Sequence, residues 1–166
     1  MSMTFPLRHL ASLLFLLLAA ATADARVFQG VVTHVTDGDS IWVRASSGGA
    51  PVEVRLQGID APEICQAFGK EARDALAGRV LRRPIAVDSR ARDGYHRVLG
   101  HVTLGGQDLG LWMVSRGYAW SYRYRRDTGP YAAAEAQARQ ARLGLWSLAT
   151  QPVEPRVFRK RHGSCH

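Results

Sequence analysis

The sequence has only one long hydrophobic run and only two cysteines, and it contains no internal repeat and no long linker. The hydrophobic run, 10–21, is shorter than the roughly 20 apolar residues that a membrane-spanning helix requires. The absence of a second run argues against a multi-span membrane protein. Two cysteines allow at most one disulfide within the chain. The chain length and the lack of a linker favour a single domain.

The N-terminal run has the features of a secretory signal. Arg8 and His9 precede it, and Ala23-Asp24-Ala25 follows it with the small-x-small pattern of a cleavage site. We therefore expect a signal peptide at 1–25, a secreted or periplasmic protein, and no stable membrane association after cleavage. An uncleaved anchor and a buried N-terminal helix are the alternatives.

The remaining chain is basic. Because residues 1–25 contain one arginine and one aspartate, the formal net charge of +8 is unchanged by their removal. A small basic domain favours an anionic partner such as nucleic acid, although a positive charge also serves solubility alone. We treat the protein as a monomer.

The pattern of residues predicts an α+β fold. Strands are expected at 27–36, 40–45, 52–56, 84–88 and 97–104, because apolar and polar residues alternate there. Helical spacing appears at 68–80, after Asp108, and at 130–143. Five short strands with an interposed helix predict a five-stranded Greek-key barrel of the OB type with three helices. The barrel domain is expected over 26–150, followed by a basic C-terminal tail, 151–166.

Acidic residues and arginines gather near the turns of the predicted barrel. Asp39 opens one strand, while Asp60 and Glu63 follow the strand that carries Arg55. Carboxylate oxygens suit a hard cation, and guanidinium groups bind phosphate with two parallel hydrogen bonds. Asp-Gly-Asp alone is common in ordinary hairpin turns. The combination with Arg55 and Arg97 is more specific and indicates phosphodiester chemistry.

These residues lie in segments that resemble the staphylococcal (micrococcal) nuclease, or thermonuclease-like, family. The similarity covers nearly all of the domain after residue 25, in order. The matching segments are 37–40, 54–63, 68–72, 93–97, 117–120, 135–138 and 144–147.

The resemblance implies a calcium-dependent endonuclease that hydrolyses DNA, RNA or both and leaves 3′-phosphate ends. It implies that Asp39, Asp60 and the carbonyl of Ala61 bind Ca²⁺. Its implied catalytic residues are Arg55, Glu63 and Arg97, with Glu63 positioning the attacking water. Tyr95 and Tyr122 correspond to tyrosines that line the nucleotide pocket.

Two departures from the family pattern stand beside the site. His96 replaces the usual glycine, and only four residues separate Glu63 from Phe68.

A catalytically inactive nucleic-acid-binding module is the alternative function, and a basic exported protein that binds polyanions is a third. The presence of all five charged residues of the pattern favours the enzyme.

The two cysteines, Cys65 and Cys165, are expected to form a disulfide, because both lie in the exported part and no third cysteine competes. Such a bond would hold the tail beside the loop that carries Glu63. Free thiols are one alternative. A metal site formed by His162, Cys165 and His166 is the other, although its spacing fits no standard zinc pattern.

Overall fold

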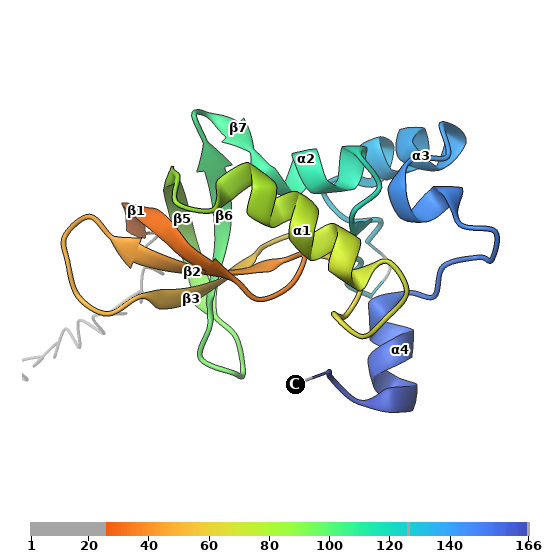
Figure 1. Cartoon of the computed structure of the whole chain (residues 1–166), viewed down its shortest axis with the longest axis horizontal. Helices are drawn as coiled ribbons and strands as arrows, with labels where there is room; N and C mark the ends of the chain where they lie inside the picture. Colours follow the sequence, from red (N-terminus) through yellow and green to blue (C-terminus); the bar gives the residue numbers. More distant parts are fainter. Residues whose placement is uncertain (1–25, 126, 166) are drawn as a thin grey trace, which may run out of the picture.

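The computed structural model describes residues 26–125 and 127–165, so the predicted signal peptide at 1–25 lies outside the described residues. A closed barrel forms the body of the protein (Figure 1). Its five strands are β1 (Arg26–Val35), β2 (Ser40–Ala45), β3 (Val52–Leu56), β5 (Pro84–Arg92) and β6 (Val98–Leu104).

The order of the strands closes the sheet on itself. Hydrogen bonding runs β3–β2–β1–β5–β6 with antiparallel neighbours, and β3 then pairs with β6 in parallel. Closure removes the exposed sheet edges that would otherwise invite pairing with other chains. The predicted α+β fold with a five-stranded OB-type barrel is confirmed.

Alternation along the strands fills the barrel as predicted. In β2, Ile41 and Val43 are fully buried, whereas Trp42 on the opposite face is 37% exposed. Val54 and Leu56 of β3 point into the same core. Because successive side chains of a strand point to opposite faces, the inward residues form one continuous apolar cluster.

The described ranges contain four α-helices, one more than predicted. They are α1 (Gly69–Val80), α2 (Leu109–Ser115), α3 (Ala132–Gln140) and α4 (Pro155–His162), with a 3₁₀ turn, η1 (Gly144–Ser147), after α3. Helix α1 crosses the front of the barrel in Figure 1 and buries Ala72, Leu76 and Val80. Helix α4 lies within the predicted basic tail. No helix within the described ranges is long and apolar enough to cross a membrane.

Three short strands accompany the five barrel strands within the described ranges. They are β4 (Ile59–Asp60), β7 (Gln107–Asp108) and β8 (Trp120–Ser121). Strand β4 pairs with β8, which places Asp60 opposite Trp120. Buried Glu135 of α3 supports β8 from behind, because its carboxylate accepts a hydrogen bond from the Ser121 backbone N–H at 2.8 Å. Glu135 also pairs with Arg139 one turn further along α3, at 2.7 Å.

Candidate active site

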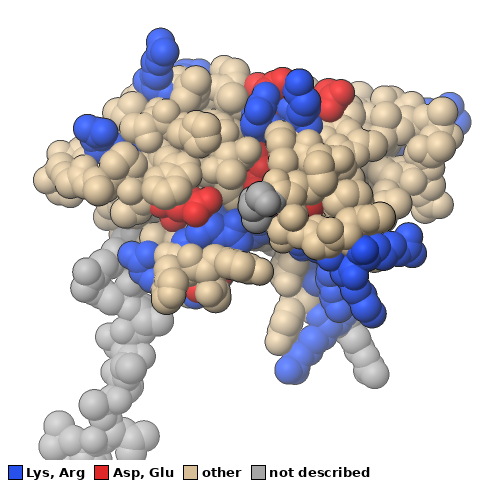
Figure 2. Space-filling view, turned by 60° about the horizontal axis from the view of Figure 1, so that its bottom comes forward, with Lys and Arg blue, Asp and Glu red and all other residues tan. Residues whose placement is uncertain are grey.

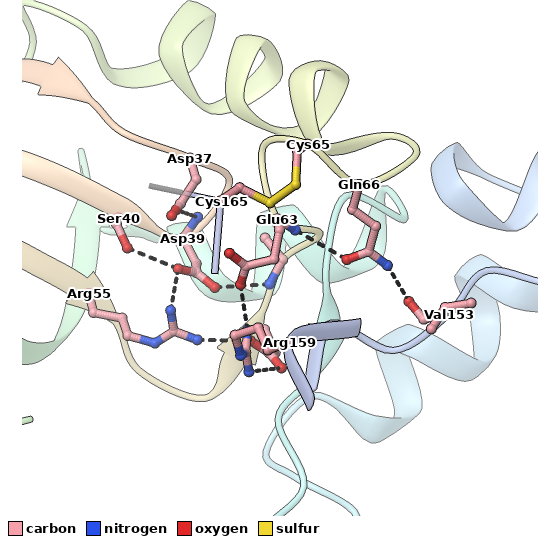
Figure 3. A network of polar contacts seen from close by, with 12 residues as sticks. Asp37, Asp39, Ser40, Arg55, Glu63, Cys65, Gln66, Val153, Arg159 and Cys165 are labelled. Carbon is pink, nitrogen blue, oxygen red and sulfur yellow. Dashed lines mark hydrogen bonds and ion pairs between the residues drawn. A yellow bond between two sulfur atoms is a disulfide. The ribbon is translucent and has the colours of Figure 1, made fainter. Parts of the chain in front are cut away.

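Three charged residues from neighbouring strands meet at the mouth of the barrel. Asp39 precedes β2, Arg55 lies on β3 and Asp60 on β4. The Arg55 guanidinium donates from Nη1 to Asp39 Oδ1 at 2.7 Å and from Nη2 to Asp60 Oδ1 at 2.9 Å. Figure 3 shows Arg55 reaching toward Asp39 from the neighbouring strand. The sequence predicted that these charged residues gather near the barrel turns, and the structure places their side chains in direct contact.

The two aspartates are almost completely withdrawn from solvent. Asp39 is 2% exposed and Asp60 is 4% exposed. Asp39 also accepts hydrogen bonds from Ser40 Oγ at 3.0 Å and from the Ala61 N–H at 2.9 Å. These fixed partners hold the Asp39 carboxylate in one orientation at the base of the site.

The density of carboxylates perturbs their protonation. Burial raises the pKa of Asp37 to about 7, and the neighbouring charge of Asp39 adds to the effect. Burial likewise raises the pKa of Asp60, again with repulsion from Asp39. Although burial opposes a charge on Arg55, the carboxylates of Asp39 and Asp60 raise the pKa of that guanidinium, so it remains protonated. The site therefore holds buried acids in excess of the cations that pair with them.

The β5–β6 turn delivers the second predicted arginine. Asp93 accepts from Arg97 Nε at 2.8 Å and from the Tyr95 N–H at 2.9 Å, and Arg97 Nη1 reaches Ser40 Oγ at 3.3 Å. Although burial works in the opposite direction, the hydrogen bonds from Arg97 lower the pKa of Asp93. His96 has φ of 65°, a left-handed conformation that glycine adopts most easily, which is the physical reason for the glycine expected there.

Glu63 lies on the loop that links β4 to α1, and helix α4 reaches it from the other end of the chain. Arg159 Nη1 donates to Glu63 Oε1 at 2.8 Å. The same guanidinium donates to Asp60 Oδ1 and Oδ2, each at 3.1 Å. Arg159 is thus part of the cluster, and Figure 3 shows it beside Glu63 and Arg55.

A disulfide joins Cys65 to Cys165, as predicted, across 100 positions of sequence and with the Cα atoms 5.8 Å apart. The free-thiol alternative is wrong, because no described cysteine is free. The metal-site alternative is wrong as well, because a disulfide-bonded Cys165 has no thiolate to bind a metal. His166 lies outside the described residues. Gln66 adds a second anchor, because its Nε2 donates to the Val153 carbonyl.

Two clefts meet at Arg55. One, of about 420 Å³, is lined by Arg55, Glu63, Tyr95, Arg97 and Arg159 among others. The other, of about 900 Å³, is lined by Arg55, Tyr122, Tyr124 and Tyr131 among others. The structure therefore places Tyr95 and Tyr122 in different clefts that share Arg55. In Figure 2, basic side chains gather on this side of the molecule at the centre and in a protruding group at the lower right.

The donor set fits a hard divalent cation. When all four are ionised, Asp37, Asp39, Asp60 and Glu63 carry four negative charges, and the guanidiniums that contact this cluster, Arg55 and Arg159, carry two positive charges. The excess of two negative charges on oxygen ligands matches a cation such as Ca²⁺. Within the described ranges, no three acidic, histidine or cysteine side chains form a ready-made metal cage. Arg55 bridges Asp39 to Asp60, and Arg159 bridges Asp60 to Glu63.

Sequence reasoning missed Arg159. It treated 151–166 only as a basic tail, and it missed α4. One signal was available: the predicted Cys65–Cys165 bond already placed the end of the chain next to Glu63. A basic residue six positions before Cys165 would then lie close to the carboxylates. Asp37, whose side chain caps the Asp39 N–H at 2.9 Å, was also given no role.

The fold and the site together define a class of protein: an OB-type barrel whose mouth combines buried carboxylates with arginines, a composition suited to phosphodiester hydrolysis. The comparisons with known proteins agree. The model of the staphylococcal nuclease homologue family matches residues 53–148. The chain belongs to this family, and it is a nuclease, a hydrolase.

Similar proteins span almost the whole chain. Protein ParB of Escherichia coli is 39% identical over 95% of this chain and 93% of its own length. A micrococcal nuclease of Shigella flexneri is 39% identical over 85% of each chain. A Haemophilus influenzae protein named as an uncharacterized endonuclease is 31% identical over 90% of this chain and 82% of its own.

Proposed function

We propose that the protein is a calcium-dependent endonuclease that cleaves DNA, RNA or both and leaves 3′-phosphate ends. The observation that carries the proposal is the cleft of about 420 Å³, where Glu63 and two phosphate-binding candidates, Arg55 and Arg97, line one space. Asp39, Asp60 and the Ala61 carbonyl are the proposed ligands of Ca²⁺. When bound, the cation supplies positive charge that polarises the phosphodiester and offsets the buried carboxylates.

The proposed reaction is an attack by water on the phosphorus of the substrate. Glu63 accepts a proton from that water as the new P–O bond forms. The P–O5′ bond then breaks, and the O5′ oxygen takes up a proton from solvent. One strand thus ends in a 3′-phosphate and the other in a 5′-hydroxyl. Glu63 suits the proton transfer because its side chain borders the cleft and is oriented by a neighbouring arginine.

Arg55 and Arg97 are proposed to hold the reacting phosphate. Their side chains are 17% and 16% exposed, so both are largely ordered by protein contacts but still face the cleft. Fixed donors of this kind stabilise the charge that develops in the transition state. Tyr95 and Tyr122 are proposed to contact nucleotides on either side, since each belongs to one of the two clefts that meet at Arg55.

The first experiment tests the need for calcium. Cleavage of single-stranded and duplex DNA should require added Ca²⁺ and stop in excess chelator. Asp39→Ala and Asp60→Ala should abolish cleavage, because each removes a proposed oxygen ligand of the cation. Asp74→Ala is the matched control, since Asp74 pairs only with exposed Arg73 on α1. Full activity in chelator would show that the calcium assignment is wrong.

We further propose export to the periplasm or the external medium, removal of residues 1–25, no stable membrane association afterwards, and action as a monomer. A disulfide supports an oxidising compartment.

Export is tested by sequencing the N-terminus of protein recovered from an exporting host. The sequence should begin Arg-Val-Phe-Gln, from Arg26 onward. A product that begins near Met1 and stays with the membrane fraction would establish an uncleaved anchor instead.

A further inference from the structure

Helix α4 is fixed to the mouth of the active-site cleft at both of its ends. Before the helix, the Val153 carbonyl accepts the hydrogen bond from Gln66, and Pro155 at the first helical position is buried. After the helix, Cys165 is bonded to Cys65, two positions beyond Glu63. In Figure 3 the partners of these anchors, Gln66 and Cys65, lie on the same loop that carries Glu63. The helix is therefore a fixed wall of the cleft.

Arg159, in the middle of α4, resembles Arg55 in one respect: each bridges Asp60 to a second carboxylate, Glu63 for Arg159 and Asp39 for Arg55. Both guanidiniums donate to Asp60 Oδ1, Arg55 at 2.9 Å and Arg159 at 3.1 Å. Although burial opposes its charge, hydrogen bonds to Asp60 and Glu63 raise the pKa of Arg159, so it stays protonated. Its side chain is 29% exposed, more than that of Arg55, and it lines the same cleft.

The hydrogen-bond inventory of Arg159 leaves one edge of the guanidinium free. Nη1 carries two protons, which go to Asp60 Oδ1 and Glu63 Oε1, and Nη2 gives one of its two to Asp60 Oδ2. Among the described residues, no acceptor takes the second Nη2 proton or the Nε proton. These two N–H groups form a parallel pair that matches two oxygens of a phosphate.

We propose that Arg159 is a third phosphate-binding arginine of this active site, supplied by a C-terminal helix that the Cys65–Cys165 disulfide holds in place. The inference rests on the proposed function. The Nη1–Nη2 edge stays on Asp60 and Glu63, and the Nε–Nη2 edge takes the non-bridging oxygens of the reacting phosphate. Arg159 contacts Glu63 directly. The phosphate within reach of Arg159 is therefore the one that is attacked by the water bound to Glu63.

The test is the steady-state kinetics of Arg159→Gln and Arg159→Lys on a single-stranded oligonucleotide at saturating Ca²⁺. We expect kcat of Arg159→Gln to fall about 10²–10³-fold, as when one preorganised donor is removed, with KM changed less than about threefold. Lysine should recover only part of the rate, because it lacks the paired donors. Arg161→Gln removes the same charge from an exposed position of the same helix and should keep the wild-type rate.

Three outcomes would overturn the inference. A rise in KM with unchanged kcat would make Arg159 a docking residue. Full rescue by lysine would mean that only its charge matters. The third is an unchanged or higher kcat for Arg159→Gln, together with tighter Ca²⁺ binding in calorimetry without substrate. This result would mean that Arg159 only blocks Asp60 from binding Ca²⁺.

A comparison with Arg55→Lys separates this inference from the proposed function. An inactive wild-type protein would refute the proposed function and the inference with it. An active wild type, a slow Arg55→Lys and a fast Arg159→Gln would refute the inference alone.

Discussion

Glu63→Gln is expected to lower kcat for phosphodiester cleavage by about 10²–10⁴-fold, the usual contribution of a positioned proton acceptor. Glutamine has the shape of glutamate and its amide oxygen still accepts the hydrogen bond from Arg159 Nη1. The substitution therefore keeps the position of the side chain and removes its ability to take a proton from water.

The measurement is kcat and KM in saturating Ca²⁺, with oligonucleotide affinity as a second readout that should change little. Glu71→Gln is the matched control, because Glu71 is an exposed residue in the first turn of α1. A kcat within about threefold of the wild type would show that Glu63 orients water without accepting its proton.

Removal of the disulfide in a Cys65→Ser, Cys165→Ser double variant is expected to lower the free energy of unfolding by about 4–5 kcal/mol. The bond closes a loop of 100 positions, and in the chain-entropy model a loop of that length restricts the unfolded chain by about this amount. The melting temperature should fall by on the order of 15 °C for a domain of this size.

Denaturant unfolding of the oxidised wild type and the double variant measures the loss. Reductant should bring the wild type to the stability of the double variant and leave the double variant unchanged. A loss below about 1 kcal/mol would mean that α4 separates from the barrel before the barrel unfolds. The disulfide would then position Arg159 without stabilising the domain.

Local patterns in the sequence were sufficient for the barrel. The alternation in 40–45 and 52–56 assigned each side chain to the inside or the outside, because a strand has only two faces. Helical spacing was expected after Asp108, and Asp108 caps the helix that forms there, because its side chain accepts from the Leu111 N–H at 3.1 Å. Both features depend on neighbours within a few residues, and so they can be read without the fold.

The contacts of charged side chains were harder to predict, because the sequence around a charged residue does not show which distant residues it meets. Glu135 and Arg139 are four residues apart on a helix, a spacing that lets them pair, and they do so. The structure shows that Glu135 is also a buried support for β8, since it accepts from the Ser121 N–H and from Arg123. That role depends on a contact between α3 and β8, which the helical spacing of 130–143 does not contain.

The sequence by itself determined the family, the barrel, the disulfide pairing and the gathering of Asp39, Arg55 and Asp60, because these follow from motif order, alternation and the count of cysteines. Only the tertiary structure decided that 155–162 form a helix and that Arg159 lies on Asp60 and Glu63. Arg159 is separated from Glu63 by 96 positions, and no local pattern encodes which carboxylates a basic segment will meet. The Gln66–Val153 hydrogen bond and the disulfide make that contact by fixing both ends of α4.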